Sequence, residues 1–219
     1  HRANRWPMKR SIAAVAAAFA ALVTWTALAP APAQDAGPKP AEGQAVATFA
    51  GGCFWCVEAD FDKVPGVVAT TSGFMGGTTP NPTYKQVTAG GTGHIEVVQI
   101  IYEPKTVSYQ QLLDVFWKSV DPYDAGGQFC DRGESYTTAI FTHDDEQRRL
   151  AEASKESLQK KGPLREPVAT AIRGAGPFTA AEEYHQDYYK KNPIRYAFYR
   201  NGCGRDARLE AIWGKKHTN

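Results

Sequence analysis

The chain has 219 residues, of which 25 are basic and 23 acidic, so its formal net charge at neutral pH is only +2. Hydrophobic residues make up 42% of the chain, and no basic run follows the first ten residues. This balance gives no reason to expect a nucleic-acid partner.

The first 33 residues have the pattern of a secretory signal peptide. Lys9 and Arg10 precede the apolar stretch SIAAVAAAFAALVTWTALA, and residues 31–33 have the A-x-A form of a cleavage site. We therefore expect cleavage after Ala33 and export, to a periplasm. The alternative is an uncleaved membrane anchor. Polar residues and a proline in the stretch disfavour it, because a span needs about 20 apolar residues.

Cleavage would leave 186 residues with 21 basic and 23 acidic side chains, a net charge of −2. Residues 34–44 (QDAGPKPAEGQ) are rich in proline, glycine and alanine, which is typical of a flexible tether. Residues 45–219 are long enough for one domain with a sizeable core. We expect this single domain to be a monomer.

The order of expected elements predicts the fold class. Alternating and continuous apolar patterns predict strands at 45–50, 67–74, 94–102, 136–142 and 168–172, and helices at 53–63, 109–120 and 144–161. Glycine-rich loops are expected at 75–93 and 121–135. The order β-α-β-β-α-β predicts an α+β protein, a two-layer sandwich with a ferredoxin-like core. From about residue 192 we expect an irregular C-terminal tail with a short helix near 206–213.

Cys53 is the first candidate for chemistry. It follows two glycines at the expected start of a helix, where backbone N–H groups and the helix dipole favour a thiolate. The alternative is an inert cysteine at a strand–helix junction. Phe54 and Trp55 follow it and would either pack in the core or wall an apolar pocket suited to a methyl thioether.

His94 and Glu96 are two residues apart on an expected strand and therefore share a face. An H-x-E near a CxxC occurs in zinc deaminases, but here the order is reversed and no third ligand is evident, so we expect no metal. Glu96 lies between Ile95 and Val97. Facing a pocket, it would have a raised pKa and could donate a proton.

Other candidates lie in loops and in the tail. Tyr84, Tyr136 and Asp131 lie in or next to the two glycine-rich loops, where each could equally be a hydrogen-bonding or turn residue. Cys203 has a glycine on either side. Such a cysteine could move to meet another sulfur or form a static disulfide.

Five stretches together resemble peptide methionine sulfoxide reductase of the A type: GGCFWCVE, GFMGGTTPNPTY, GTGHIEVV, CDRGESY and FTAAEEYHQDYYKKNP. The resemblance covers about residues 46–214. It implies repair of oxidised methionine with specificity for the S epimer of the sulfoxide.

The resemblance also implies a role for each matching residue. Cys53 would attack the sulfoxide sulfur, and Glu96 would protonate its oxygen. Tyr84 and Tyr136 would hydrogen-bond that oxygen. The substrate-binding residues would be Phe54 and Trp55, which hold the methyl group, with Asp131 and His94 nearby.

Cys53 would end as a sulfenic acid, which Cys203 would resolve to a disulfide. A thioredoxin-like protein, or dithiothreitol in vitro, would reduce it, with no bound cofactor. The chain departs from the family pattern at Cys56, where glycine is usual, and at Phe74, where tyrosine is usual. Cys56 and Cys130 therefore remain alternative resolving thiols.

Two other functions would explain fewer of these residues. A thioredoxin-like oxidoreductase would use Cys53 and Cys56 as a dithiol, but it would leave Glu96 and the tyrosines without a role. A non-enzymatic domain would be stapled by Cys53–Cys56 and Cys130–Cys203. The first of these bonds closes too small a loop to stabilise much.

Overall fold

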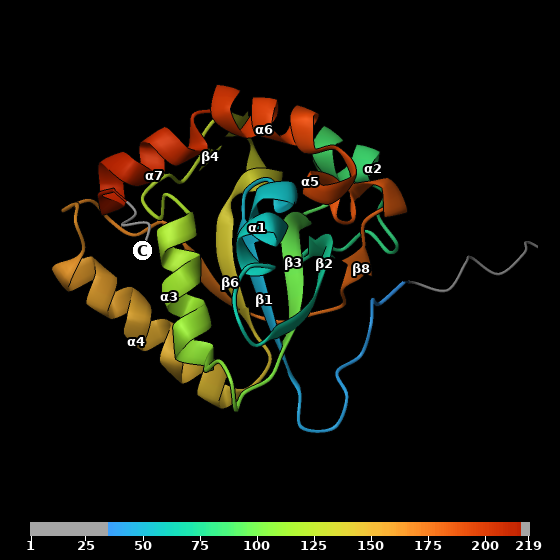
Figure 1. Ribbon diagram of the computed structural model, residues 1–219, viewed down its shortest axis with the longest axis horizontal. Coiled ribbons are helices and arrows are strands. Elements are labelled where there is room, and N and C mark those ends of the chain that lie inside the picture. The colour runs from blue at the N-terminus through green and yellow to red at the C-terminus, as the bar shows by residue number, and fades with distance from the viewer. Residues whose placement is uncertain (1–34, 216–219) are drawn as a thin grey trace, which may run out of the picture. The chain divides into compact units, whose positions relative to one another are not determined.

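The computed structural model describes residues 35–215 (Figure 1). Its strands are β1 (Ala45–Gly51), β2 (Val67–Met75), β3 (Ile95–Tyr102), β4 (Gly127–Gln128), β5 (Asp131–Arg132), β6 (Thr138–Thr142), β7 (Ala171–Gly174) and β8 (Thr179–Ala180). Its α-helices are α1 (Phe54–Phe61), α2 (Tyr84–Ala89), α3 (Tyr109–Ser119), α4 (Asp145–Lys161), α5 (Tyr188–Lys191), α6 (Pro193–Gly202) and α7 (Arg205–Trp213). Two 3₁₀ turns cover Glu134–Tyr136 and Glu183–His185.

The main sheet has the strand order β7-β6-β1-β3-β2-β8. Among its four central strands, β6-β1-β3-β2, each strand is antiparallel to its neighbours, and α1 and α3 connect them in the β-α-β-β-α-β order. The predicted ferredoxin-like core is therefore confirmed. β7 adds a parallel strand at one edge and β8 a short antiparallel strand at the other.

Helices α1, α3 and α4 cover one face of this sheet (Figure 1). The core between the layers contains Phe49 of β1, stacked between Phe61 of α1 and Phe116 of α3 at ring-centroid distances of 5.2 and 5.0 Å. A smaller apolar cluster, which includes Phe141 and Phe178, lies on the other face. The molecule is thus the expected two-layer sandwich.

Alternation along the strands decides which polar groups face the helices. Val98 and Ile100 of β3 belong to the core under α1 and α3, so Glu96, two residues earlier, faces the same layer. In β2, Phe74 has the same orientation, and so have Thr70 and Ser72. Two buried polar regions are therefore placed beneath α1, one at each end.

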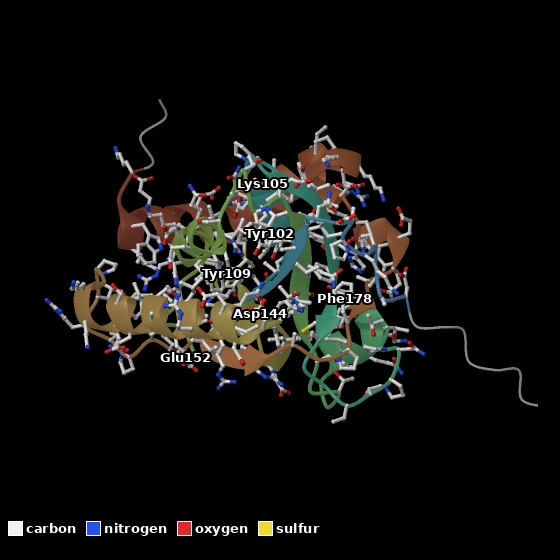
Figure 2. All side chains as sticks on the ribbon, turned by 90° about the horizontal axis from the view of Figure 1, so that it is seen from below. Tyr102, Lys105, Tyr109, Asp144, Glu152 and Phe178 are labelled. Atoms are coloured by element: carbon white, nitrogen blue, oxygen red, sulfur yellow. A yellow bond between two sulfur atoms is a disulfide. The ribbon has the colours of Figure 1, made fainter. Side chains whose placement is uncertain are left out.

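The two ends of the sheet differ in chemistry. Cys53 follows the end of β1, whereas Tyr102 pairs with Ala45 at the start of that strand. Tyr102 and Tyr109 close the core at this second end, near Asp144 (Figure 2). Burial is the main cause that raises the pKa of Tyr109 above its usual range. The candidate residues all belong to the first end.

The glycine-rich loops contain regular structure that their composition did not predict. Thr83 and Gln86 form a capping box, in which each side chain accepts from the other residue's backbone N–H, and this box starts α2. In the second loop, β4 and β5 form a hairpin with Phe129 and Cys130 at its tip.

The tail from residue 192 is helical, which corrects the expectation of an irregular segment. Pro193 begins α6 at a position where proline suits a helix. The Arg200 guanidinium then bridges Asp60 of α1 and Asp206 of α7 at 2.9 and 2.7 Å. Ile194 and Phe198 point to solvent, so the apolar pattern of α6 does not mark a core face. The predicted short helix is present as α7.

Residues 35–44 contain no helix or strand, and the Asp35 carbonyl accepts a hydrogen bond from the Ala180 N–H of β8. Within residues 35–215, no helix is long and apolar enough to cross a membrane. The predicted signal peptide lies outside the described residues.

Candidate active site

Cys53 occupies the N-cap position of α1, reached from β1 through a glycine turn. Gly52 has φ +81°, and a Cβ there would lie 2.6 Å from Cβ of Gln128 in β4. Both facts demand glycine at this position. The turn thus lies against the β4–β5 hairpin, and Cys53 after it has only 6% of its surface exposed.

Glu96 lies directly beneath the first residue of α1. Its Oε2 accepts a hydrogen bond of 2.9 Å from the Phe54 backbone N–H. Burial raises the pKa of Glu96 well above its usual range, because it outweighs that hydrogen bond, and Asp131 and Cys56 add to the rise. As expected from the sequence, this carboxyl is buried and can hold a proton at neutral pH.

Cys53 and Cys56 are both free thiols, and they are hydrogen-bonded to each other. Burial, followed by the interactions with Cys56, raises the pKa of Cys53 well above its usual value. The expectation of a lowered pKa at Cys53 is thus wrong. Desolvation exceeds the helix-end effect.

The neighbouring thiol has the opposite shift. The hydrogen bond from Cys53, with the charges of Arg205 and Arg200, lowers the pKa of Cys56 to about 7 despite its burial. The Arg205 guanidinium is itself buried and donates to the carbonyls of Gly51 and Ser119 at 3.0 and 2.7 Å.

The predicted tyrosines meet beside Glu96. Tyr84 begins α2, Tyr136 ends a 3₁₀ turn, and the two phenols are hydrogen-bonded to each other. Burial and then the Glu96 carboxyl raise the pKa of both phenols. Asp131 is also close, and burial raises its pKa although a hydrogen bond from Tyr199 opposes the rise. Five candidate residues from four separate motifs therefore share one site.

Aromatic residues surround this group. Phe54 is buried and contacts Tyr84, with ring centroids 6.2 Å apart. Trp55 is half-buried, stacks on Tyr188 at 3.8 Å, and donates from its indole N–H to His185 Nδ1 at 3.0 Å.

Three functional neighbours were not singled out from the sequence, namely His185, Tyr188 and Tyr199. Tyr199 of α6 is hydrogen-bonded to Cys53 and donates to Asp131. All three come from the C-terminal part, which returns over α1 only in the folded protein. The run YHQDYY within a resembling motif was the one signal available for the first two.

His94 does not join the site through its ring. Its Nδ1 accepts from the Gly77 N–H at 3.1 Å, and its Nε2 is 2.7 Å from the Thr79 carbonyl oxygen. Both nitrogens therefore hold the loop before β3. The substrate contact expected of His94 stays a prediction.

The remaining cysteines, Cys130 and Cys203, form a disulfide with a Cα–Cα distance of 4.9 Å. Cys203 Sγ is 4.0 Å from the Tyr199 hydroxyl, the same hydroxyl that is hydrogen-bonded to Cys53. Cys203 is thus adjacent to the site, but its partner is Cys130 and not Cys53.

A cavity of about 960 Å³ lies on another side of α1, between α6 and α7, and is lined by Tyr196, Arg200 and Trp213 among others. It does not include Cys53. The candidate residues therefore belong to the aromatic site around Cys53 and not to this cavity.

A thiol beside a buried carboxyl and two phenols provides the groups needed to reduce a sulfur whose S–O bond is polarised. In such chemistry a thiol attacks the sulfur, while an acid and phenols stabilise the departing oxygen. Together with the Cys130–Cys203 disulfide, these groups define the class of protein, a thiol-dependent oxidoreductase on a ferredoxin-like sandwich.

Comparisons with known proteins narrow the class. The family model described as "Peptide methionine sulfoxide reductase" matches residues 45–217. The chain is 55% identical over 177 residues to peptide methionine sulfoxide reductase MsrA of Bacillus licheniformis, which covers 81% of this chain and 98% of the relative. It is 49% identical over 198 residues to MsrA 2 of Rhizobium meliloti, covering 90% and 94%.

Solved structures agree with the fold. Reduced Mxr1 from Saccharomyces cerevisiae superposes with a TM-score of 0.67 at 33% identity, over 71% of this chain and 90% of that one. Methionine sulfoxide reductase A of Corynebacterium diphtheriae gives 0.63 at 30%, over 73% and 88%. The chain belongs to the peptide methionine sulfoxide reductase family, and its activity is that of a peptide-methionine (S)-S-oxide reductase.

Proposed function

We propose that Cys53 is the nucleophile and Glu96 the acid in this reduction. The observation that carries the proposal is their common position at the first turn of α1, where Glu96 Oε2 is held by the Phe54 N–H next to Cys53. A sulfoxide sulfur becomes a good electrophile when its oxygen is protonated or strongly hydrogen-bonded. The thiol and the acid can therefore act on neighbouring atoms of one S–O bond.

Tyr84 and Tyr136 supply further hydrogen bonds to the sulfoxide oxygen, with Asp131 nearby. Their phenols already lie beside Glu96, and their raised pKa values keep them protonated as donors. Phe54 and Trp55 hold the methyl group of the substrate. Sulfur and methyl groups pack favourably against aromatic rings, so this wall suits a methionine side chain.

The first chemical step leaves a sulfenic acid on Cys53 and releases methionine. The thiol of Cys203 then attacks the sulfenic sulfur, forming a disulfide and releasing water. A thioredoxin-like dithiol reduces that disulfide by exchange. Support for Cys203 comes from its contact with the Tyr199 hydroxyl beside Cys53, while Cys56 and Cys130 are the competing resolving thiols.

We also propose that the protein is exported to a periplasm after cleavage near Ala33, that it is a monomer, and that residues 45–219 form one catalytic domain. The leader pattern supports export. An oxidising compartment would make a dedicated thioredoxin-like partner necessary to keep Cys53 reduced.

The test of these roles is an epimer-resolved assay. Protein purified without the leader is incubated with dithiothreitol and each sulfoxide epimer of a blocked methionine, and methionine release is followed. Cys53→Ser should abolish reduction of the S epimer. Cys130→Ser is the matched control for the first methionine released per chain, because that first reduction precedes any resolving step. Undiminished turnover by Cys53→Ser would end the assignment.

A further inference from the structure

The cysteines are in an unequal state: Cys53 and Cys56 are free thiols, while Cys130 and Cys203 are joined. We propose that Cys130 is the last thiol in a two-step disulfide exchange (the relay), in which Cys53 is oxidised first and Cys203 second. Cys130–Cys203 is then the disulfide present at the end of each turnover. The proposal rests on the reductase function assigned above. It gives Cys130 a role that the family pattern does not supply.

Exposure gives the relay its direction. Cys53 and Cys56 are 6% and 1% exposed, so a protein reductant cannot reach their sulfur atoms without large movement. Cys130, in contrast, is exposed at the tip of the β4–β5 hairpin, and Cys203 is half-buried between it and the site. Oxidation formed at Cys53 would therefore travel outward to the sulfur that a reductant can reach.

The two cysteines are held together by contacts that do not involve sulfur. The Phe129 ring, next to Cys130, lies under the Arg205 guanidinium at 4.7 Å, and Arg205 is two residues after Cys203. On the other side, Asp131 accepts a hydrogen bond from Tyr199, one helical turn before Cys203. The reduced thiols would therefore remain neighbours, ready to form the bond.

The hairpin is built for this placement. Phe129 has φ +56°, a left-handed conformation that is costly for a bulky residue and persists only where the surroundings enforce it. The contact with Arg205 and the tight pairing of Gln128 with Asp131 supply that enforcement. They direct Cys130 towards the C-terminal end of α6.

The segment that carries Cys203 is open on both sides of this residue. Gly202 and Gly204 flank it, and a side chain on either glycine would meet no atom within 4 Å. Tyr199 places its hydroxyl against Cys53 on one side and 4.0 Å from Cys203 Sγ on the other. Tyr199 therefore interacts with both sulfur atoms, and the relay requires Cys203 to exchange its partner Cys130 for Cys53 across that hydroxyl.

The steps balance as follows. Cys53 sulfenic acid and the Cys203 thiol form Cys53–Cys203 and water. The Cys130 thiolate then attacks the Cys203 sulfur, the Cys203–Cys53 bond breaks, and Cys53 leaves as a thiolate. The product is the Cys130–Cys203 disulfide beside a regenerated nucleophile. The sulfoxide is the only oxidant, and a thioredoxin-like dithiol later takes up the oxidation by reducing the disulfide.

Counting methionine in the absence of reductant tests the relay. Fully reduced wild-type protein, freed of dithiothreitol and given excess S epimer, should release two methionines per chain, the second oxidation remaining on Cys53. Cys130→Ser should release half as much, because its first disulfide blocks Cys53. Equal yields from the two proteins would overturn the proposal.

A second measurement needs no variant. After one equivalent of S epimer, thiols are alkylated and disulfide-linked peptides are identified by mass spectrometry. The relay predicts a Cys130–Cys203 peptide with Cys53 alkylated. Cys53 in a disulfide, with Cys130 alkylated, would overturn it. Failure of the reductase function itself would look different, because the wild-type protein would then release no methionine even with dithiothreitol.

Discussion

Glu96 and Glu58 make an instructive pair, because both are buried carboxyls at the interface of α1 with the sheet. Each is 1% exposed, and burial is the main cause that raises each pKa. Glu96 lies under the first residue of α1, and Glu58 belongs to its second turn. On burial and pKa alone, both would qualify as acids for catalysis.

Their neighbours separate them. The Glu58 carboxylate accepts from the hydroxyls of Thr70 and Ser72, both at 3.2 Å, and from the Asp187 N–H at 3.1 Å. No thiol is among these partners. Glu96 instead faces Cys53, Tyr84 and Tyr136. A raised pKa thus makes a proton available, and only a reacting group in reach makes that proton useful.

The most direct test of this difference is to neutralise each carboxyl in turn. Glu96→Gln should lower the rate of S-sulfoxide reduction by about 10²–10⁴-fold, the usual contribution of a positioned acid. Glu58→Gln is the matched control and should change the rate by less than about threefold. Single-turnover measurements check both, because they isolate the chemical step. A large loss of rate in Glu58→Gln would show that the two sites are not separate.

The pH dependence of kcat/KM tests the protonation states required of Glu96 and Cys53. Glu96 must be protonated to act, so the rate should fall as pH rises through its raised pKa. Cys53 must lose its proton, so the rate should rise as pH approaches the raised pKa of that thiol. The wild type should therefore show both limbs, as apparent values of the coupled group. In Glu96→Gln the falling limb should be absent, and its persistence would assign that limb to another group.

Glu58 should affect how the free energy of unfolding depends on pH. Its pKa is about 7 in the folded protein against an ordinary 4.5, mainly through burial and then the charges of Asp62 and Asp187. A raised folded pKa stabilises the protein fully below pH 4.5, and this contribution is lost as pH rises through 7. The difference corresponds to about 3 kcal/mol.

Urea denaturation at pH 5 and pH 8 measures this contribution. The wild type should lose stability between the two, and Glu58→Gln should lose less by about 2–3 kcal/mol. Glu103→Gln, which alters a partly exposed carboxyl at the end of β3, is the control and should follow the wild type. Equal losses in all three proteins would remove Glu58 as the titrating group.

The sequence predicted the part of the site that local patterns encode. Cys53 was found from its glycines and expected helix start, and Glu96 from its apolar neighbours on a strand. The β-α-β-β-α-β order then correctly predicted the sheet that brings them together. These features depend on neighbours within a few residues, so periodicity and turn chemistry are sufficient to find them.

What the sequence left open depends on distant contacts. Tyr199 and His185 are over 100 residues from Cys53 in sequence. Arg200 ties α6, which carries Tyr199, to α1, and His185 accepts a hydrogen bond from Trp55. The pairing of Cys203 with Cys130 across 73 residues is equally non-local. The pKa of Cys53 was misjudged for the same reason, because its burial comes from segments that no local pattern displays.

The smallest expected effect concerns the wall of the site. Trp55 donates to His185 Nδ1, and burial lowers the pKa of His185, so this ring is a neutral acceptor. His185→Phe keeps an aromatic ring but removes the acceptor. A lost hydrogen bond of about 1 kcal/mol corresponds to a fall in kcat/KM of about fivefold. Tyr184→Phe, at an exposed neighbour, is the control.

The KM–kcat split shows whether His185 acts through Trp55. A residue that only positions the indole should raise KM for the sulfoxide and leave the single-turnover rate close to wild type. His185→Gln, which can still accept the indole hydrogen, should recover most of the loss. If kcat falls instead and glutamine does not restore it, His185 would belong with Glu96 in the proton chemistry. His185 and Glu96 would then both take part in proton transfer at the first turn of α1, and Glu58 in the second turn would remain outside the chemistry.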